Sequence, residues 1–497
     1  MLNKVFFDRR AELMMEKYLT YEQFGAVGDG AVDDFDAIIA CHNKANETGA
    51  AVKAKDGARY CIKKVGTAVI KTDVDFGGAE FIIDDTCVPL DRRGANIFNV
   101  VSDYKKIPID VKSLKKDQKK LEFPHTGNAY VRLVDATKPQ FIRKGLNKNA
   151  GKPMTDAFVV DGEGNVKNRV NYDYDNITEA FYKCIDDTPI TVRGGKFTTV
   201  ANRAESFYNY HGRGFYVQRC NVTLENITHI VTGELDHGAP YGGFVSVDES
   251  VNVTLRDCLL SPHLVYWTPS KEPGKLVPMG SYDINFGNCL NCTVKGIRQT
   301  VDIHDNRYWG IIHTNFCKNL LVEDCVMSRY DAHEGVTDII IRNCEFGHQR
   351  VNLIGYGEAL LENCIMTGAC FFALRDDYGA FWNGNITLRG CTLNAVNPGG
   401  SCVMFRAYNE GDHYFGYKCA MPTVLTLENV TVNDEKIEPD KNVFLLPYYD
   451  SFKNPDKPYP YTTTKKLVIK NLKISTGRKY RISPYDERYA GLEIIEI

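Results

Sequence analysis

The 497-residue sequence contains no apolar run that approaches the length of a membrane span. Residues 1–16 mix Lys, Asp, Arg and Glu, and they lack the apolar core that precedes the cleavage site of a signal peptide. We therefore expect a protein that neither crosses a membrane nor is exported by a signal peptide, and we predict a cytoplasmic location.

The sequence also has little excess charge, with a formal net charge of −3 at pH 7. Such a balance gives no strong field to attract nucleic acid or an anionic surface, so no nucleic-acid or membrane partner is expected. The local exception is a lysine-rich segment, 105–120. We interpret it as a solvated arm, with contact to an acidic glycan or a neighbouring subunit as the alternative.

What the sequence does contain is a repeat of short apolar runs with period-two alternation, which is typical of strands. The nine runs are VTLENIT (222–228), VTLRDCL (253–259), CTVKGIR (292–298), LLVEDCVM (320–327), IIIRNCEF (339–346), ALLENCIM (359–366), ITLRGCTL (386–393), LTLENVTV (425–432) and LVIKNLKI (467–474).

Aligning the nine runs produces one column of small to medium apolar residues: Ile227, Cys258, Ile297, Cys325, Cys344, Cys364, Cys391, Val430 and Leu472. The residue before this column is always Asn, Asp or Gly, types that tolerate the left-handed backbone of a sharp bend. Spacings of 19 to 42 residues suit stacked coils with inserted loops. The alignment predicts a parallel β-helix, and an antiparallel sandwich is the alternative.

Sixteen cysteines are enough for a set of disulfides, but many of them fall in this inward column. There a cysteine behaves as a small buried hydrophobe, so we expect reduced thiols.

The segment 21–62 contains Phe24-Gly-Ala-Val-Gly-Asp-Gly30, followed by Asp33-Asp34 and an amphipathic run to Glu47. It resembles the opening motif of the pectin-lyase-like superfamily, in which a helix caps the first coil of a right-handed parallel β-helix. The usual Pro-x-Gly-x-Tyr continuation is altered here to Val52-Lys-Ala-Lys-Asp-Gly57-Ala-Arg-Tyr60. The resemblance implies a glycan-active protein but does not choose among hydrolases, lyases, epimerases and tailspikes.

The predicted fold class is therefore all-β, a right-handed parallel β-helix with an N-terminal capping helix and a β-rich insertion. We divide the chain into a cap with the first coils (1–99), the insertion (100–170) and the main β-helix with long loops (171–497). A homo-oligomer is expected, a trimer before a dimer, because the ends and flat faces of such a helix are sticky.

One polar signature occurs twice, as Val301-Asp-Ile-His-Asp305 and as Tyr330-Asp-Ala-His-Glu334. The apolar runs before the two copies lie 28 residues apart. If those runs stack, the two signatures face one surface, and crowded carboxyls there would provide the acid and base of glycoside hydrolysis. The predicted catalytic residues are Asp302, Asp331, His304, His333, Asp305 and Glu334.

Further polar and aromatic residues follow strands near this surface, where they would hold sugar rings, hydroxyls or a carboxylate. The predicted substrate-binding residues are Arg350, Arg375, Asp376, Asp377, His237, Trp267, Trp309 and His313. Polygalacturonase-type hydrolases have a series of motifs of which only Asp376-Asp377 has a counterpart here, and its order is wrong. The roles of that series are therefore not transferred.

The predicted function is a glycoside hydrolase that acts on a carbohydrate substrate without a cofactor. A lyase or epimerase acting on a uronate-containing glycan is the alternative, because an Arg, His and Asp set would serve it too. A non-catalytic, tailspike-like binding module is the second alternative. Two Asp-x-His copies also suit a divalent metal, but their spacing matches no established motif, and no metal site is predicted.

Overall fold

The structure is a computed structural model that describes residues 18–144, 150–205, 210–235, 238, 240–269, 273–310, 312–408, 413–447, 462–484 and 489–497. Within these ranges, no helix is long and apolar enough to cross a membrane. The expected oligomer and the cytoplasmic location stay predictions.

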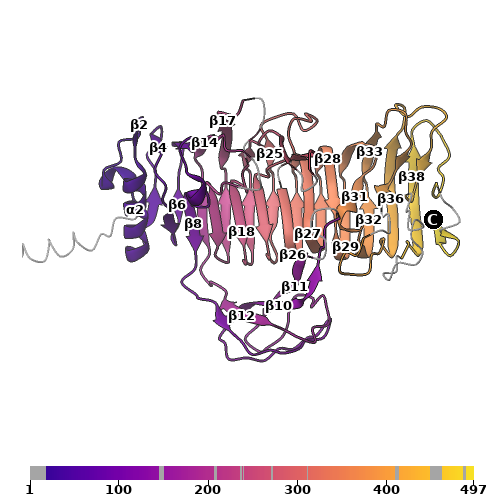
Figure 1. The fold of residues 1–497 in the computed structure, drawn as a ribbon, viewed down its shortest axis with the longest axis horizontal. Coiled ribbons are helices and arrows are strands. Elements are labelled where there is room, and N and C mark those ends of the chain that lie inside the picture. Colours follow the sequence, from indigo (N-terminus) through magenta and orange to yellow (C-terminus); the bar gives the residue numbers. More distant parts are fainter. Residues whose placement is uncertain are drawn as a thin grey trace, which may run out of the picture.

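Figure 1 shows an elongated stack of strands that runs from the N-terminal helix to the C-terminus. One 31-stranded parallel sheet winds through the whole body. Each coil contributes a strand to three columns, which we call columns A, B and C in chain order. Many strand pairs are in register over their full length, as for Val222–Glu225 on Val253–Arg256. The predicted all-β parallel β-helix is confirmed.

The strands of column A are β1 (Tyr18–Leu19), β3 (Ala51–Lys53), β6 (Val74–Asp75), β13 (Ile190–Arg193), β16 (Val222–Glu225), β19 (Val253–Arg256), β24 (Thr293–Lys295), β29 (Gly355–Glu362), β32 (Trp382–Arg389), β38 (Lys466–Ile474) and β39 (Glu493–Glu496). Those of column B are β2 (Asp29–Asp33), β4 (Arg59–Ile62), β7 (Glu80–Asp84), β14 (Lys196–Val200), β17 (Thr228–Thr232), β20 (Leu259–Leu260), β25 (Arg298–Gln299), β30 (Ile365–Gly368) and β33 (Thr392–Ala395). Those of column C are β5 (Ala68–Ile70), β8 (Phe98–Val101), β15 (Phe215–Gln218), β18 (Val245–Asp248), β23 (Ile284–Gly287), β31 (Phe372–Leu374) and β35 (Phe405–Arg406). Long strands that pass from one column to the next are β26 (Ile312–Glu323), β27 (Val326–Arg342), β28 (Glu345–Leu353) and β36 (Val424–Asn433).

The aligned column of nine apolar residues is buried in the interior, apart from Leu472 at the C-terminal end, which is half-buried. The residue before each has a left-handed backbone, as predicted, with φ between 52° and 64°. These nine are Asn226, Asp257, Gly296, Asp324, Asn343, Asn363, Gly390, Asn429 and Asn471. Their short side chains allow the chain to turn sharply from column A to column B in every coil.

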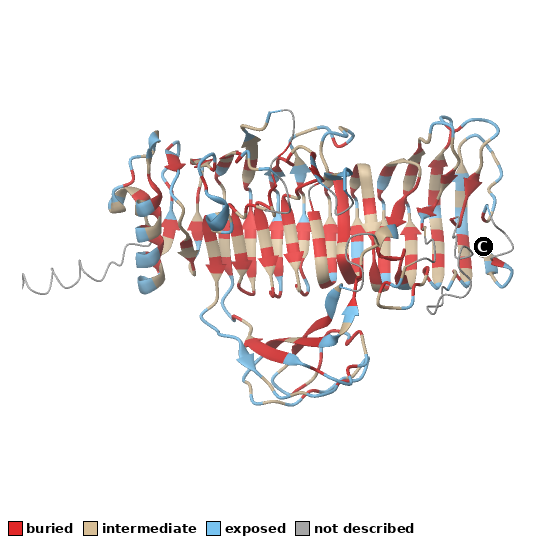
Figure 2. Cartoon of the chain, in the orientation of Figure 1, coloured by how far each residue is buried: buried red, intermediate tan, exposed pale blue. Residues whose placement is uncertain are grey.

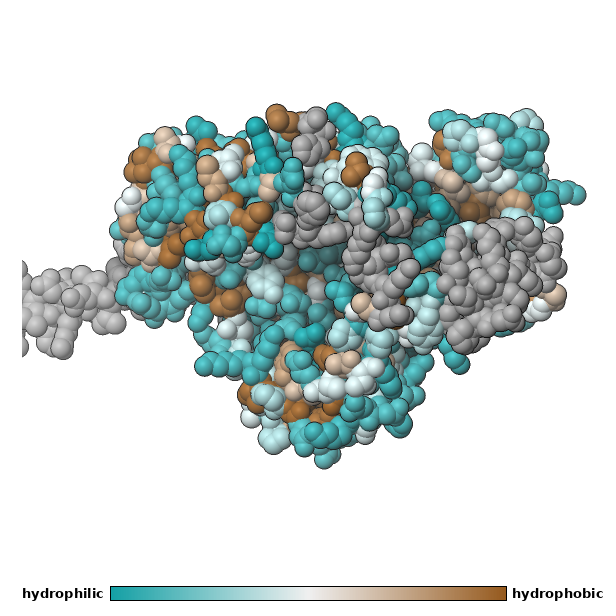
Figure 3. All heavy atoms as spheres, viewed as in Figure 1, coloured by the Kyte–Doolittle hydropathy of each residue, from teal (hydrophilic) through white to brown (hydrophobic). Residues whose placement is uncertain are grey.

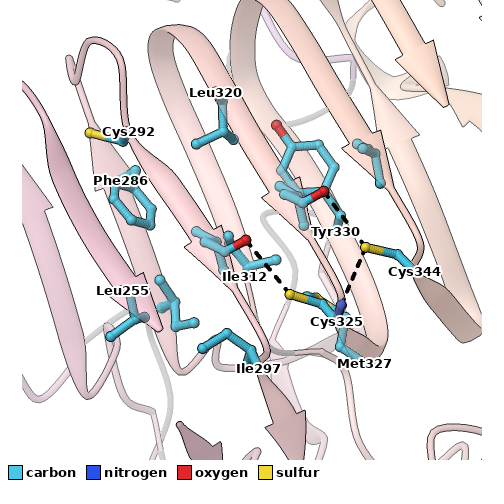
Figure 4. Packing of buried hydrophobic residues seen from close by; sticks show 14 of the residues in the cluster. Leu255, Phe286, Cys292, Ile297, Ile312, Leu320, Cys325, Met327, Tyr330 and Cys344 are labelled. Atoms are coloured by element: carbon cyan, nitrogen blue, oxygen red, sulfur yellow. Dashed lines mark hydrogen bonds between the residues drawn. The ribbon is translucent and has the colours of Figure 1, made fainter. Parts of the chain in front are cut away.

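All sixteen cysteines are free thiols, and fourteen of them are buried. Figure 4 shows Cys325 and Cys344 on neighbouring coils of the core, where the Cys325 N–H donates to Cys344 Sγ at 3.4 Å. Figure 2 shows the alternation of buried and more exposed positions along the strands of the stack. The expectation of buried, unbridged thiols at Cys258, Cys325, Cys344, Cys364 and Cys391 is confirmed.

Replacing Cys344 by Asp is expected to destabilise the fold by several kcal/mol, because the new carboxyl would lie in a space that is 2% exposed. Chemical denaturation of the variant would measure the loss. Titration of the native protein with a thiol reagent is the companion test. Rapid labelling of Cys344 before unfolding would contradict the buried position.

The N-terminal cap is built around Asp34, whose carboxylate accepts the backbone N–H of Val27 at 2.7 Å and that of Cys61 at 3.2 Å. These bonds tie the glycine-rich turn to the next strand. The predicted helix follows as α2 (Phe35–Thr48), which buries Phe35 and Ile38 against the first coils. The capping helix is thus part of the core.

The insertion leaves the β-helix after β8 and forms a four-stranded antiparallel sheet of β9 (Ile107–Pro108), β10 (Ala129–Gln140), β11 (Lys152–Val160) and β12 (Glu179–Cys184). This sheet runs on to Cys184, beyond the limit of residue 170 given by the sequence. Its own apolar cluster includes Leu133 and Phe158. In Figure 1 the insertion hangs below the stack, beside the middle coils.

The insertion is bound to the β-helix by buried polar contacts. Lys318 forms an ion pair with Asp156, and both side chains are at most 2% exposed. The Tyr130 hydroxyl donates to the Asn288 carbonyl at 2.9 Å, and Lys183 Nζ donates to the Gln218 carbonyl at 2.8 Å. The insertion is therefore held against the coils, because detaching it would leave buried charges unpaired.

Candidate functional site

The two copies of the polar signature do not stack on each other. Their apolar runs do, with Thr293 paired to Leu321 and Arg298 to Val326. After Gln299, however, the chain leaves the sheet and forms a turn, whereas the second copy continues along β27. On that coil the strand partner of Asp331 is His313, so Asp302 lies in a loop of the neighbouring coil and the prediction that it stacks beside Asp331 is wrong.

The first signature lies in a surface loop. Asp302 and His304 are exposed, and the Asp302 carboxylate accepts only the nearby His304 N–H at 2.9 Å. Asp305 pairs with Arg307, which lowers the pKa of Asp305. The Ile303 carbonyl accepts the His348 N–H at 3.2 Å, so this loop covers a later coil. The structure thus separates these three residues from the second signature, and a catalytic role for them stays a prediction.

Asp331, in the second signature, is fully buried within an ionic cluster. Its carboxylate accepts from Arg375 Nη1 at 2.6 and 2.8 Å and from the Tyr282 hydroxyl at 2.6 Å, and it pairs with Arg329 at 2.8 Å. Burial alone would raise the pKa of Asp331, but the two guanidinium groups outweigh it and hold that pKa far below its ordinary value. Asp331 is thus a permanently ionised carboxylate.

The ionic cluster extends to other predicted residues. Arg375 also holds Asp377, with contacts of 2.6 and 2.8 Å, and Arg143 of the insertion reaches Asp377 at 2.8 Å. Burial would raise the pKa of Asp377, but the charge of Arg375 lowers it to about 2. A carboxylate so engaged serves positioning better than proton transfer.

Aromatic residues close the cluster on its outer side. Trp309 donates to the Tyr282 hydroxyl at 2.7 Å and lies against the Arg329 guanidinium, 5.0 Å from the ring centroid. His313 packs on the Tyr282 ring at 4.5 Å, and burial lowers the pKa of His313 to about 4. Both residues were predicted to bind substrate. The structure places them in the packing beside the cluster.

The remaining predicted binding residues are more scattered. Trp267 is 59% exposed on the hairpin of β21 (Tyr266–Pro269) and β22 (Leu276–Met279). Asp376 is half-exposed and pairs with Arg406 at 3.6 Å, while Arg350 has a left-handed backbone on β28. His237 lies outside the described residues. Trp267, Asp376 and Arg350 do not line the groove described next.

A β-bulge in β27 re-aims the second signature. His313 pairs with Asp331, but Asn315 pairs with Glu334, so β27 contains one extra residue there. Bulges are frequent next to active sites, where they redirect a side chain. Because of the bulge, Glu334 becomes the strand partner of Asn315 and occupies an outward-facing position beside it. His333 stays next to it, with Nδ1 3.2 Å from Asn315 Oδ1.

Glu334 opens onto a groove of about 630 Å³ between column C and the insertion. The β-helix side is formed by outward residues of β15, β18, β23, β26 and β27, among them Tyr216, Asp248, Asn285 and Asn315. The insertion contributes the opposite wall, which includes Arg132, Lys152, Thr155 and Glu179. A cavity of this size with convergent polar groups is the best candidate for a binding site in the described structure.

Two carboxyl groups in the groove have raised pKa values. Burial raises the pKa of Glu334, and the Lys152 ammonium, 3.5 Å away, offsets it only in part. Burial, followed by the charge of Glu249, raises the pKa of Asp248. Perturbed carboxyls in one cleft indicate a functional site.

Asp248 and Glu334 belong to one row of outward positions: Asp248, Gly287, Asn315 and Glu334 on successive coils. Asp248 leans toward the next coil, because a Cβ added at Gly287 would lie 2.8 Å from Asp248 Oδ1. The Asn288 amide on that coil donates to Asp248 Oδ1 at 3.3 Å, and the Tyr216 hydroxyl donates to Oδ2 at 3.2 Å. From the Gly287 coil to Glu334 there are two strand spacings, about 9.5 Å.

Replacing Gly287 by Ala is expected to displace the Asp248 carboxylate and to lower turnover of any substrate by about tenfold or more, because a misplacement near 1 Å has effects of this order. Folding should be little affected, since Gly287 is half-buried. Gly491→Ala is the matched control, because nothing lies within 4 Å of its added Cβ. Equal turnover in the two variants would exclude a role for the leaning carboxylate.

Sequence reasoning missed Asp248, Tyr216, Asn285 and Asn288. A signal was present: Val245-Ser-Val-Asp248 and Ile284-Asn-Phe-Gly287 are period-two runs that precede two of the nine aligned runs. A second alignment of these strands would have placed Asp248 and Gly287 in one row. The described residues contain no group of three or more His, Cys, Asp or Glu side chains that could hold a metal ion.

No family model matches the chain, and no curated protein is similar to it in sequence. Solved structures, in contrast, match over nearly the whole chain. The tailspike gp61 of Pseudomonas phage phi297 shares 11% identity with a TM-score of 0.50, covering 97% of this chain and 84% of its own. The tailspike protein gp49 of Pseudomonas phage LKA1 shares 13% with a TM-score of 0.51, covering 92% and 78%.

The fold is a parallel β-helix like that of these tailspikes. The fold implied by the glycine-rich opening motif is thereby confirmed. A third structure, the Gp54 tailspike of Acinetobacter baumannii bacteriophage AP22, was solved in complex with a capsular saccharide of its host. It shares 10% identity with a TM-score of 0.51, covering 94% of this chain and 76% of its own. Identities this low concern the fold of the parallel β-helix and leave its activity to the site itself.

Proposed function

We propose that the protein is a glycoside hydrolase that binds a glycan in the groove between column C and the insertion. The observation that carries the proposal is the pair of carboxyls with raised pKa values, Asp248 and Glu334, which face one groove from strands three spacings apart. Hydrolysis of a glycosidic bond requires two such groups, one protonated and one ionised.

The surroundings of the two carboxyls suggest their roles. Asp248 accepts from two neutral donors, Tyr216 and Asn288, which stabilise its ionised form. Glu334 has two long contacts, with Lys152 Nζ at 3.5 Å and with His333 Nδ1 at 3.9 Å, and burial raises its pKa. Glu334 would therefore give its proton to the leaving oxygen. Asp248 would take a proton from the water that attacks the anomeric carbon.

The separation of the two groups also predicts the stereochemical outcome. The strands of Asp248 and Glu334 lie three spacings apart, about 14 Å, and the lean of Asp248 toward Gly287 shortens the distance between the carboxyls toward the roughly 6.5–9.5 Å in which a water molecule fits between acid and base. A nucleophilic carboxylate of a retaining enzyme would lie nearer, at about 5–5.5 Å. We therefore propose inversion at the anomeric carbon.

The test is a screen of the purified protein on an oligosaccharide panel, with the products identified by mass and, for a cleaved substrate, the anomer identified by NMR. Products that gain one water molecule support the hydrolase. Unsaturated products that absorb in the ultraviolet would instead show a lyase. Glycan binding without cleavage would show a binding module.

A further inference from the structure

The charge of the groove argues against a polyanionic ligand. Of the described residues that line it, three are acidic, Glu179, Asp248 and Glu334, and two are basic, Arg132 and Lys152. Both cations already have partners. Arg132 Nη1 lies 3.0 Å from Glu249 Oε1, and Lys152 Nζ lies 3.5 Å from Glu334 Oε1.

Most of the buried polar atoms without a protein partner along the groove are acceptors. Asn285 Oδ1, Asn288 Oδ1 and His211 Nε2 have no hydrogen-bond partner among the described residues, and Arg132 Nε is the one donor in the same condition. The orientation of Asn288 is fixed, because its Nδ2 donates to Asp248. Its free oxygen can only accept a hydrogen bond.

His211 presents an acceptor as well. Its Nδ1 lies 3.3 Å from the Pro240 carbonyl, which can only accept, so Nδ1 carries the proton. Burial lowers the pKa of His211, which keeps the ring neutral and leaves a lone pair on Nε2. Buried acceptors of this kind are satisfied by a donor from water or from a ligand.

We infer that the substrate of the groove is a neutral glycan, whose hydroxyl groups donate to Asn285, Asn288 and His211, and not a uronate polymer. This inference rests on the proposed function. A hydroxyl group supplies the donor that each free acceptor lacks. A carboxylate supplies none, and in this groove it would meet a surplus of acidic side chains. Figure 3 shows that hydrophilic side chains predominate on the face around the insertion.

The experiment compares binding of two sets of oligosaccharides by calorimetry, using the Glu334→Gln variant, which slows cleavage while Asp248 keeps its charge and its contact with Asn288. One set is neutral, with gluco-, manno-, xylo- and galacto-oligosaccharides, and the other contains oligogalacturonates and oligoguluronates. Binding of a neutral oligosaccharide in preference to every uronate is the expected result. Preferential binding of a uronate would overturn the inference while leaving a glycan-binding groove. Binding of neither set would overturn both the inference and the proposed function.

A single-residue variant tests the acceptor itself. Asn285→Ala in the Glu334→Gln background should weaken binding of the neutral ligand by about two- to tenfold, the effect of one neutral hydrogen bond. Asn352→Ala is the matched control. Asn352 follows His313 and Asp331 as the next strand partner along the stack, and its side-chain amide donates to the Gln349 carbonyl at 2.9 Å. Equal affinity in both variants would contradict the role of Asn285.

Discussion

Replacing Glu334 by Gln is expected to lower turnover by about a hundredfold to ten-thousandfold, the usual effect of losing general acid catalysis. The change keeps the volume of the side chain and removes the proton that the leaving oxygen needs. Asp248→Asn should have an effect of similar size, because it removes the base. Turnover and the melting temperature, Tm, would be measured together on the substrate found by the screen, and Tm should change little.

The pH dependence of the native protein gives a second measurement on Glu334. Because its pKa is raised, Glu334 stays protonated at a pH where an ordinary glutamate is ionised. The alkaline limb of the turnover profile should therefore lie above the ordinary glutamate range of about 4.3. Asp302→Asn is the control for the exposed signature. If that variant loses turnover while Glu334→Gln retains it, the site lies in the surface loop and the assignment to the groove is wrong.

Replacing Asp331 by Asn is expected to destabilise the protein by about 3–5 kcal/mol, because it leaves the buried charges of Arg329 and Arg375 without their partner. Chemical denaturation would measure this loss. Turnover per folded molecule should be largely retained, since Asp331 is held by three side chains in a site that is 0% exposed. A stable variant without turnover would restore the catalytic role predicted from the signature.

Asp376→Asn is the matched control for the buried charge. Its side chain is 47% exposed and its arginine contact is 3.6 Å long, so its effect should stay within about 0.5 kcal/mol. The Asp331 contribution also depends on pH. Because the folded-state pKa is depressed, the stabilisation is complete above the unfolded value of about 3.9 and is lost progressively as the pH falls below it.

The coil architecture could be predicted from the sequence because it depends on residue patterns within each coil. Each run alternates apolar and polar residues, and each ends in an Asn, Asp or Gly with a left-handed backbone, such as Asn343 or Gly390. Stacking repeats this pattern, so one alignment predicts the interior column, the free thiols and the fold class. The opening motif fixed the capping helix for the same reason, since Asp34 binds residues close to it.

The candidate site was only partly predictable. Glu334 was among the predicted residues, but its pairing with Asp248 was not, and Asp302 was expected in the sheet although it lies in a loop. The chain leaves the sheet after Gln299, and a bulge shifts the register at Glu334; neither departure changes the apolar pattern of the runs. A comparison of strand positions therefore cannot detect them.

The sequence by itself determined the β-helix, its cap and its reduced core, because these follow from alternation and turn residues within each coil. Only the tertiary structure decided which polar residues meet. Lys152 lies opposite Glu334 because a separate antiparallel sheet, held by the buried Asp156–Lys318 pair, docks beside the coils. Contacts between residues so far apart in the chain depend on how two independently formed surfaces fit, and no local pattern records that fit.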